Sequence, residues 1–352
     1  MRYDVWATVK DPGEAEGMYP VVRYLRAFGV SVRLLASGHA LDELRSKGCE
    51  HWDATDVQAI LTQHNIPKLL LTSTAFRGGA GRDLIPLVRG KATTVLLQSL
   101  WGGLAGWGPE HQPDHVITND RIGERMVTTL WPTLKPGSVF KTGFPMLDQY
   151  VGADVLGEAG TVRQMLRLDY KPVIVFAGQS DATSAMLSEL VEVLNPHRDY
   201  IHFAPRPHPR MMRDYAHEAD RWNRALSRYR GELVVSDQCS MRQMVAVAYQ
   251  WGAVVSMYST ALLEAAAARA SAIAMLYPEA HQAFRKENPG LEQFPLAELG
   301  CAGYVTDRTE LERVISDALT QGNIWRKNQE RHIVADGQNA RRAAEVVLSL
   351  LN

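Results

Sequence analysis

The sequence predicts an α/β protein of two domains, each built around a parallel β-sheet. Short apolar runs, typical of buried parallel strands, alternate with helix-like stretches along the whole chain. The 352 residues are enough for two domains of ordinary size. The alternation weakens across residues 150–160, which contain three glycines, and resumes at Pro172. We therefore place the hinge between the domains at residues 150–160.

The first half of the chain contains six expected strands with helices between them. The strands are expected at residues 3–8, 30–35, 68–71, 93–97, 115–118 and 139–142. The helices are expected at residues 14–28, 40–47, 56–64, 82–88 and 121–130. Because the strands are separated by helices, the pattern predicts stacked βαβ units and a parallel sheet.

The second half repeats this pattern, and the chain ends in an amphipathic helix. Strands are expected at residues 172–178, 199–204, 232–236, 252–255 and 271–275. The terminal helix begins near Asp336, after capping residues. We expect one domain to comprise residues 1–150 together with 336–352, and the other to comprise residues 151–335.

Composition excludes several classes of protein. Lys and Arg (38) nearly balance Asp and Glu (39), so the net charge of −1 favours neither nucleic-acid binding nor general binding to anionic membranes. Three cysteines without a CxxC pair argue against a disulfide framework and a structural zinc site. Without a secretory signal or an apolar run of about twenty residues, we expect a cytoplasmic protein, with peripheral membrane contact left open.

Two segments of the second half suit an anionic ligand. Arg206-Pro207-His208-Pro209-Arg210 follows one expected strand, and residues 256–265 follow another and open an alanine-rich helix. In open α/β sheets, ligands bind outside the carboxyl ends of strands, where a helix N-terminus presents unpaired N–H groups. A cationic loop and a helix headed by Ser259 and Thr260 therefore predict a nucleotide-diphosphate site.

Individual residues of this site have specific expected roles. His208 is expected to hydrogen-bond a donor phosphate, with Arg206 and Arg210 adding charge; an ordinary surface loop is the alternative. Ser259 and Thr260 are expected to meet the diphosphate as well as to cap the helix. The turn formed by Gly178, Gln179 and Ser180 allows close backbone approach to a ligand, or is a tight βα turn and nothing more.

Four motifs, taken in order, resemble the GT-B glycosyltransferase superfamily, which also contains the UDP-N-acetylglucosamine 2-epimerases. They are Thr-Gly-Phe-Pro-Met-Leu-Asp at 142–148, the His-Pro loop at 208, Ser-Thr-x-x-x-Glu-Ala from 259, and Asp-Gly-x-x-x-x-Arg from 336. The resemblance implies two Rossmann-like domains with parallel sheets facing a central cleft. It also implies that the C-terminal helix crosses back to the first domain, and that Glu264 holds the ribose hydroxyls of the nucleotide.

The resemblance leaves the nucleotide open. Similar His-Pro loops occur in capsule and teichoic-acid polymerases of this superfamily, which use cytidine-activated donors. We expect a UDP-linked sugar as donor substrate, with CMP-, CDP- and GDP-linked donors as alternatives, and no other cofactor. The acceptor would be a glycan, a lipid or a small molecule, as in polysaccharide biosynthesis.

The first loop resembles two members of the superfamily imperfectly. Residues 13–22 are similar to the epimerase stretch Pro-Glu-Ala-Ile-Lys-Met-Ala-Pro-Val-Val and to Gly-Glu-Ala-Ser-Gly-Asp of lipid A disaccharide synthases. The epimerase arginine falls on Pro12, and the synthase aspartate falls on Met18. The epimerase motifs His-Gly-Asp-Thr and His-Val-Glu-Ala-Gly are replaced by Leu-Thr-Ser-Thr-Ala at 71–75 and Leu-Gln-Ser-Leu-Trp at 97–101.

Epimerisation by that route needs carboxylates to move protons, and these positions lack them. We therefore rank a glycosyltransferase first and an epimerase or hydrolase of sugar nucleotides second. A non-catalytic nucleotide-binding protein of the same fold is third.

The acceptor is expected to contact the first domain. A transferase that inverts the sugar needs a base for the acceptor hydroxyl, and Glu14 is our candidate, with Glu110, His111 and His115 as rivals. The glycine-rich loop 98–108 carries Gln98, Trp101 and Trp107, which we expect to contact the acceptor because tryptophan faces stack on sugar rings. The same tryptophans could instead close the core. No metal is required in this scheme, because the helix dipole with Arg and His side chains stabilises the departing diphosphate.

Overall fold

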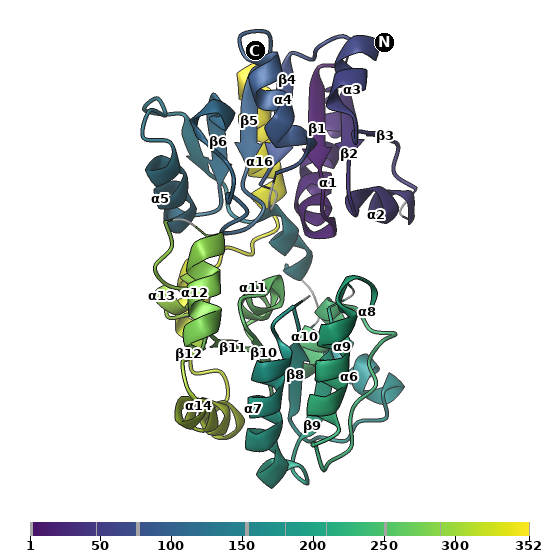
Figure 1. Cartoon of the computed structure of the whole chain (residues 1–352), viewed down its shortest axis with the longest axis vertical. Helices are drawn as coiled ribbons and strands as arrows, with labels where there is room; N and C mark the ends of the chain where they lie inside the picture. The colour runs from purple at the N-terminus through teal and green to yellow at the C-terminus, as the bar shows by residue number, and fades with distance from the viewer. Residues whose placement is uncertain are drawn as a thin grey trace. The chain divides into compact units, whose positions relative to one another are not determined.

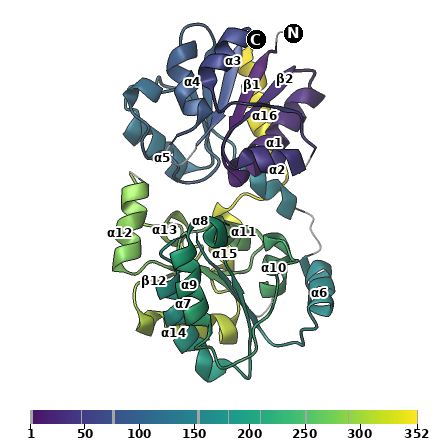
Figure 2. The same cartoon turned by 45° about the vertical axis from the view of Figure 1, so that its right-hand side comes forward.

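The computed structural model divides the chain into two compact units (Figures 1 and 2). It describes residues 3–46, 48–74, 78–151, 155–179, 181–208, 210–249, 252–288 and 290–351. Unit 1 comprises residues 1–151, 285–292 and 334–352, and unit 2 comprises residues 152–284 and 293–333. The expected division at residues 150/151 and 335/336 lies within two residues of these bounds. The return of residues 285–292 to unit 1 was not foreseen.

Unit 1 is built on a seven-stranded parallel sheet in the order β3-β2-β1-β4-β5-β6-β7 (Figure 1). Its strands are β1 Val5–Val9, β2 Val32–Ala36, β3 His51–Asp53, β4 Leu69–Ser73, β5 Thr93–Leu97, β6 His115–Thr118 and β7 Val139–Lys141. Its helices are α1 Pro12–Ala27, α2 Ala40–Ser46, α3 Val57–Gln63, α4 Ala80–Val88, α5 Arg121–Leu130 and α16 Asn339–Leu351, with 3₁₀ turns η1 Pro109–His111 and η2 Pro145–Tyr150.

Both faces of this sheet are buried, as expected for parallel strands joined by helices. Alternate residues of β1, such as Val5 and Ala7, form one core with the apolar faces of α1 and α16. Trp6, between them, is fully buried on the other face, where α4 packs against β1 and β4.

Unit 2 has a five-stranded parallel sheet in the order β12-β11-β10-β8-β9. Its strands are β8 Val173–Ala177, β9 His202–Arg206, β10 Ala253–Ser256, β11 Ser271–Met275 and β12 Gly303–Val305. Its helices are α6 Val155–Met165, α7 Ser184–Leu194, η3 Asn195–His197, α8 Met211–Asp214, α9 Ala216–Leu226, α10 Met241–Ala248, α11 Thr260–Ala267, α13 Pro295–Glu298, α14 Arg308–Gln321 and α15 Arg326–His332; α12 Pro278–Glu287 runs from unit 2 into residues of unit 1.

The α/β class and the parallel sheets are as predicted, with three differences among the strands. β3 and β12 were not expected; each is a three-residue edge strand without an apolar run. The strand expected at residues 232–236 is wrong, because only an isolated bridge joins Leu233 to Phe203. After this bridge, the carbonyl of Ser236 accepts a hydrogen bond from the guanidinium of Arg206.

The motif at 142–148 holds the C-terminal helix against unit 1. The carboxylate of Asp148 accepts the N–H groups of Asn339 (3.0 Å) and Ala340 (2.8 Å), which begin α16. Asn339 Nδ2 donates to the carbonyl of Phe144 (3.0 Å). Gly143 has φ +85°, and a Cβ there would lie 2.1 Å from Asn339 Oδ1, so glycine is needed on both counts. In Figures 1 and 2, α16 accordingly lies beside α1.

The closing Asp-Gly-x-x-x-x-Arg motif has a related structural role. Both terminal nitrogens of Arg342 donate to the Asp336 carboxylate, at 2.7 and 3.1 Å, and Arg342 Nε donates to the carbonyl of Thr142 (2.9 Å). The pair therefore ties the entry of α16 to the end of β7. In the described part of the chain, no helix is long and apolar enough to cross a membrane.

Candidate functional site

The loops predicted to bind the donor meet at one edge of the sheet of unit 2. β8 lies between β9 and β10, and all three strands are parallel, so their carboxyl ends adjoin. Gly178 N–H donates to the carbonyl of Arg206 (2.8 Å), and Ser256 Oγ donates to the carbonyl of Ala177 (2.6 Å). The loops bearing Gln179, His208 and Ser259 therefore start from three neighbouring strand ends.

His208 is held with one ring nitrogen as an acceptor. The N–H of Arg210 donates to His208 Nδ1 (3.2 Å). A neutral imidazole with an accepting Nδ1 carries its proton on Nε2. In a neutral His208 ring, Nε2 is therefore the donating nitrogen.

The two arginines of this loop are already bound within the protein. Arg206 Nη1 donates to the carbonyl of Ser236 (2.6 Å) and Nη2 to that of Cys239 (2.8 Å). Arg210 Nε pairs with Asp214 (3.0 Å), one turn further along. Both guanidiniums thus brace the backbone or a neighbouring carboxylate, and phosphate contact would draw on their remaining N–H groups.

The N-terminus of α7, which follows Gly178, Gln179 and Ser180, already holds an anion. Glu218 Oε1 accepts the N–H groups of Thr183 (2.7 Å) and Ser184 (2.6 Å), so this helix end is capped by a buried carboxylate of α9. A Cβ at Gly178 would lie 2.6 Å from the ring of Trp222, so the glycine accommodates a tryptophan. Gln179 is half-buried, and Ser180 lies outside the described residues.

The N-terminus of α11, in contrast, is capped by a neutral group. Ser259 Oγ accepts the N–H of Ala261 (3.2 Å), and the first turn contains no acidic residue. Thr260 begins the helix and is half-buried, whereas Glu264, one turn later, is 8 % exposed. Of the two helix ends at this edge, α11 is therefore the one whose positive dipole is not neutralised by a carboxylate cap.

A second polar edge lies at the carboxyl ends of β1, β4, β5 and β6 in unit 1, which are consecutive in the sheet. Glu14, in the first turn of α1, is 6 % exposed. Its Oε2 accepts the N–H of Lys10 (2.9 Å) and the hydroxyl of Ser73 (2.8 Å), which ends β4. Both of these hydrogen bonds go to Oε2, and the backbone N–H of Asp11 also hydrogen-bonds the carboxylate.

Burial raises the pKa of the Glu14 carboxyl to about 8, and the hydrogen bonds from Lys10 and Ser73 oppose that rise only in part. A carboxyl with this pKa exchanges its proton near neutral pH. General acid–base catalysts are most effective when their pKa lies near the working pH. The role of Glu14 as a general base stays a prediction, and its raised pKa is the property that a test can address.

The ends of β5 and β6 carry two buried amides with unpaired atoms. Gln98 is fully buried and its Oε1 has no hydrogen-bond partner among the described residues. Asn119 is 5 % exposed, and both its Oδ1 and Nδ2 are without partners in the same part of the structure. Gln98 N–H bonds the carbonyl of Ile117 (2.8 Å), so the two residues extend neighbouring strands.

The two tryptophans predicted to contact the acceptor differ in their exposure to solvent. Trp101 is half-buried; its Nε1 donates to the Asp120 carboxylate (3.0 Å) and its ring meets that of Phe144 edge-on. Trp107 is 5 % exposed and packs edge-on against the ring of Trp131. Stacking of an acceptor on Trp107 would therefore require this loop to move, whereas Trp101 is accessible as it stands.

Asp120, Asn119 and Ser73 were missed by the sequence reasoning. Asp120 caps α5 through the N–H groups of Ile122 and Gly123, both 2.9 Å from Oδ1. Burial raises the pKa of the Asp120 carboxyl, against these donors and Trp101. The available signal was a polar residue directly after each apolar strand, in Thr-Ser at 72–73 and Asn-Asp at 119–120.

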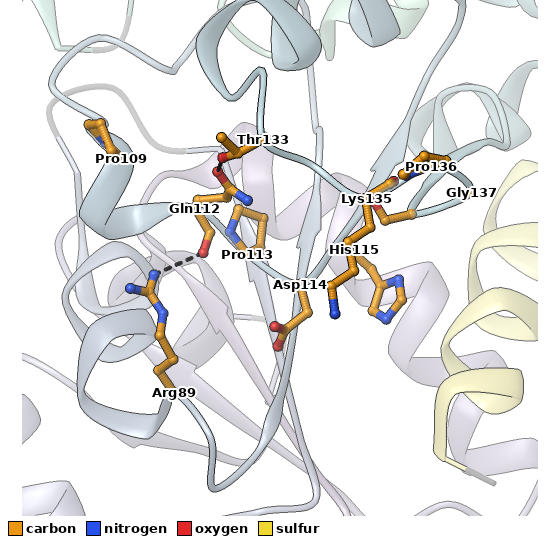
Figure 3. Close-up of a pocket in the computed structure, with 11 residues that line it drawn as sticks. Arg89, Pro109, Gln112, Pro113, Asp114, His115, Thr133, Lys135, Pro136 and Gly137 are labelled. Atoms are coloured by element: carbon orange, nitrogen blue, oxygen red, sulfur yellow. Dashed lines mark hydrogen bonds between the residues drawn. The ribbon is translucent and has the colours of Figure 1, made fainter.

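The rival bases lie elsewhere in unit 1. His115 begins β6, so it lies at the amino edge of the sheet, opposite the edge that carries Glu14. It lines a hollow of about 460 Å³ together with Pro109, Gln112, Lys135 and Arg89 (Figure 3). Glu110 and His111 belong to η1, which begins with Pro109, and pair with each other (3.1 Å). None of the three is placed at the carboxyl edge beside Ser73 and Gln98.

Known structures resemble this chain over its whole length. The wall teichoic acid polymerase TagF is 12 % identical, with a TM-score of 0.62 and coverage of 99 % of this chain and 88 % of that one. MnaA from S. aureus, solved with UDP, is 11 % identical, with a TM-score of 0.67 and coverage of 99 % and 98 %. This chain has the GT-B fold.

A glycosyltransferase from Rickettsia africae also has this fold, at 11 % identity, with a TM-score of 0.64 and coverage of 100 % of this chain and 99 % of that one. No family model matches the sequence, and no curated protein matches it. Because the identities are so low, the GT-B likeness concerns the arrangement of the chain and not its reaction.

Proposed function

We propose that this GT-B protein is a glycosyltransferase that moves a sugar from a nucleotide donor to an acceptor hydroxyl without a catalytic metal. Unit 2 binds the nucleotide diphosphate, and unit 1 binds the acceptor. The observation that carries the proposal is Glu14, a buried carboxyl with a pKa of about 8 at the carboxyl edge of the sheet of unit 1.

In the proposed donor site, the diphosphate binds at the N-terminus of α11, as the Glu218 carboxylate does at the N-terminus of α7. The N-terminus of α11 and His208 Nε2–H supply positive potential and hydrogen bonds from neighbouring strand ends. Glu264, one turn into the same helix, binds the ribose hydroxyls. UDP is the proposed nucleotide, and cytidine or guanosine nucleotides are the alternatives that a binding test separates.

In the proposed reaction, the Glu14 carboxylate takes the proton of the acceptor hydroxyl while the hydroxyl oxygen attacks the anomeric carbon of the donor sugar. The bond between this carbon and the diphosphate oxygen breaks, and its electron pair stays on the diphosphate. His208 and the N-terminus of α11 stabilise the charge that develops there. Gln98 Oε1 and both amide atoms of Asn119 are unpaired and suit acceptor hydroxyls, which both donate and accept hydrogen bonds, once the loops that bury them move as for Trp107.

The same edge argues against an epimerase that uses carboxylates after the third and fourth expected strands. The ends of β4 and β5 carry Ser73, Thr74, Gln98 and Ser99, none of which moves a proton as a carboxylate does. Asp120, at the end of β6, already accepts three N–H groups. We therefore keep the transferase ahead of the epimerase.

Nucleotide binding tests the donor half of the proposal. Thermal unfolding of the chain is measured with UDP, GDP, CDP, CMP and dTDP, since a ligand that binds the folded state raises its unfolding temperature. His208→Ala should weaken the preferred nucleotide at least tenfold. His202→Ala is the matched control, because His202 begins the strand that His208 follows and so lies at its opposite end.

Turnover tests the transfer itself. Incubation of the preferred sugar nucleotide with a panel of acceptors should release the nucleoside diphosphate only when an acceptor is glycosylated. A sugar inverted at C2 without any acceptor would establish the epimerase instead. Nucleotide binding without turnover on any acceptor would favour a non-catalytic protein.

A further inference from the structure

Three side chains near the start of α7 form a cluster with the donor atoms of a metal site. Asp181 lies in the loop between β8 and α7, and His217 and Glu218 lie in the first turn of α9. One ligand atom of each residue lies within 4.8 Å of the others. α7 and α9 pack side by side in unit 2, as both views show (Figures 1 and 2).

Glu218 is the residue that points to a ligand. It is fully buried, and its Oε1 is occupied by the N–H groups of Thr183 and Ser184. Its Oε2 is buried without any hydrogen-bond partner among the described residues. A buried carboxylate oxygen without a partner is costly, because the charge is desolvated on that side and nothing compensates for it.

We infer that Asp181, His217 and Glu218 bind one divalent cation of the first transition series, such as Zn²⁺, Co²⁺ or Mn²⁺. An imidazole nitrogen with two carboxylate oxygens suits these ions, whereas Mg²⁺ and Ca²⁺ prefer oxygen ligands alone. Two carboxylates and a neutral histidine balance the charge of a divalent ion. The cation supplies the missing partner of the buried Glu218 carboxylate.

The distances fit after a small movement of exposed side chains. Bonds of about 2.1 Å place two ligand atoms on one ion at most about 4.2 Å apart. His217 Nε2 and Asp181 Oδ1 are already 3.4 Å apart. Their side chains are 60 % and 51 % exposed, so they are free to turn towards the fixed Glu218.

The bound cation links the loop after β8 to the first turn of α9. Asp181 lies in the segment between β8 and α7, so the ion holds the end of this segment in place. None of its three ligands is His208 or a residue of α11, so the site is built from other residues than those proposed for donor binding in unit 2. Its loss should therefore affect stability before it affects transfer.

The test uses the untagged full-length chain after removal of metals with a chelator. Titration with Co²⁺, followed by calorimetry and visible absorption, should show one tight site per chain. Asp181→Asn and His217→Gln should each weaken that site at least tenfold. Both side chains are exposed, so neither change should prevent folding.

Asp169→Asn is the matched control. Asp169 also contacts a histidine, His202 (2.7 Å), but this pair belongs to no three-residue cluster in the described part of the chain. The Co²⁺ affinity of the Asp169→Asn variant should stay within twofold of that of the parent chain. Co²⁺ or Zn²⁺ should also raise the unfolding temperature of the parent and of Asp169→Asn, but not that of the two site variants.

Two results would overturn the inference. One is the absence of a stoichiometric site for Co²⁺, Zn²⁺ and Mn²⁺ in the parent chain. The other is a site whose affinity is unchanged by both Asp181→Asn and His217→Gln, which would assign the binding to other histidines or to the three cysteines. Strong sulfur-to-cobalt absorption would identify the cysteines directly.

Discussion

Replacing Glu14 with glutamine should change how the stability of unit 1 depends on pH. The amide oxygen of glutamine can still accept hydrogen bonds from Lys10 N–H and Ser73 Oγ, so these two contacts are retained. What the substitution removes is the ionisation of a buried carboxyl. The parent and the variant therefore differ mainly in the protons they exchange on unfolding.

The sign follows from the two states of Glu14. Its pKa is about 8 in the folded protein and 4.5 when exposed, so between these values the unfolded chain is ionised while the folded chain keeps its proton. The contribution of Glu14 to the free energy of unfolding is therefore greatest below pH 4.5. It falls as the pH rises from 4.5 to about 8, because ionisation then favours the unfolded chain. The loss is about 1.4 kcal/mol per pH unit, or about 5 kcal/mol across the range.

Urea unfolding at a series of pH values measures this difference. The parent should lose free energy of unfolding between pH 5 and 8 relative to Glu14→Gln, in the transition assigned to unit 1. Glu16→Gln is the control, because Glu16 is an exposed residue on the same helix and should follow the parent. Parallel curves for the parent and Glu14→Gln would show that the folded-state pKa of Glu14 is near 4.5, and the reasoning from burial would be wrong.

Activity gives an independent measurement on the same residue. A base must be unprotonated, so the transfer rate of the parent should rise with pH through about 8. Glu14→Gln should lower kcat about 10²- to 10⁴-fold and remove that limb of the pH profile. An unchanged rate in the variant would exclude Glu14 as the base while leaving the stability prediction intact.

Two further substitutions test the structural account of the motifs. Gly178→Ala places a Cβ 2.6 Å from the ring of Trp222, and the clash should lower the free energy of unfolding of unit 2 by about 1–3 kcal/mol in a urea titration; an unchanged value would mean that the ring moves aside without cost. Asp148→Ala removes the acceptor for the first N–H groups of α16 and should cost unit 1 about 1–2 kcal/mol, with faster amide exchange at Asn339 and Ala340. Exchange at the parent rate would contradict a capping role for Asp148.

The alternation of apolar runs and helical stretches was enough to predict most of the strands of both sheets. Such runs are local, and a parallel strand that is buried on both faces must be apolar along its length. β3 and β12 escaped prediction because an edge strand of three residues needs no such run. Residues 233–235 are apolar yet form only a bridge at Leu233, and Val235 is exposed to solvent instead of being buried in the sheet.

The placement of candidate residues at strand ends was also accessible from local pattern. His208 and Ser259 each follow an apolar run, and parallel strands bring their carboxyl ends to one edge. The sequence did not show which of the predicted binding groups already have hydrogen-bond partners within the protein. Arg206 binds carbonyls 30 and 33 residues away, and the N-terminus of α7 is capped by Glu218, which is 35 residues from Thr183.

The amino-acid order thus sufficed for the fold class and for the edge of each sheet at which polar residues follow the strands, since these depend on periodicity over a few residues. The three-dimensional packing decided which charged groups already have partners within the protein. Glu14 acquires its raised pKa from burial in unit 1. Oε2 of Glu218 is buried in unit 2, where α9 packs against α7. Desolvation is a property of the whole environment of an atom, and no local pattern records it.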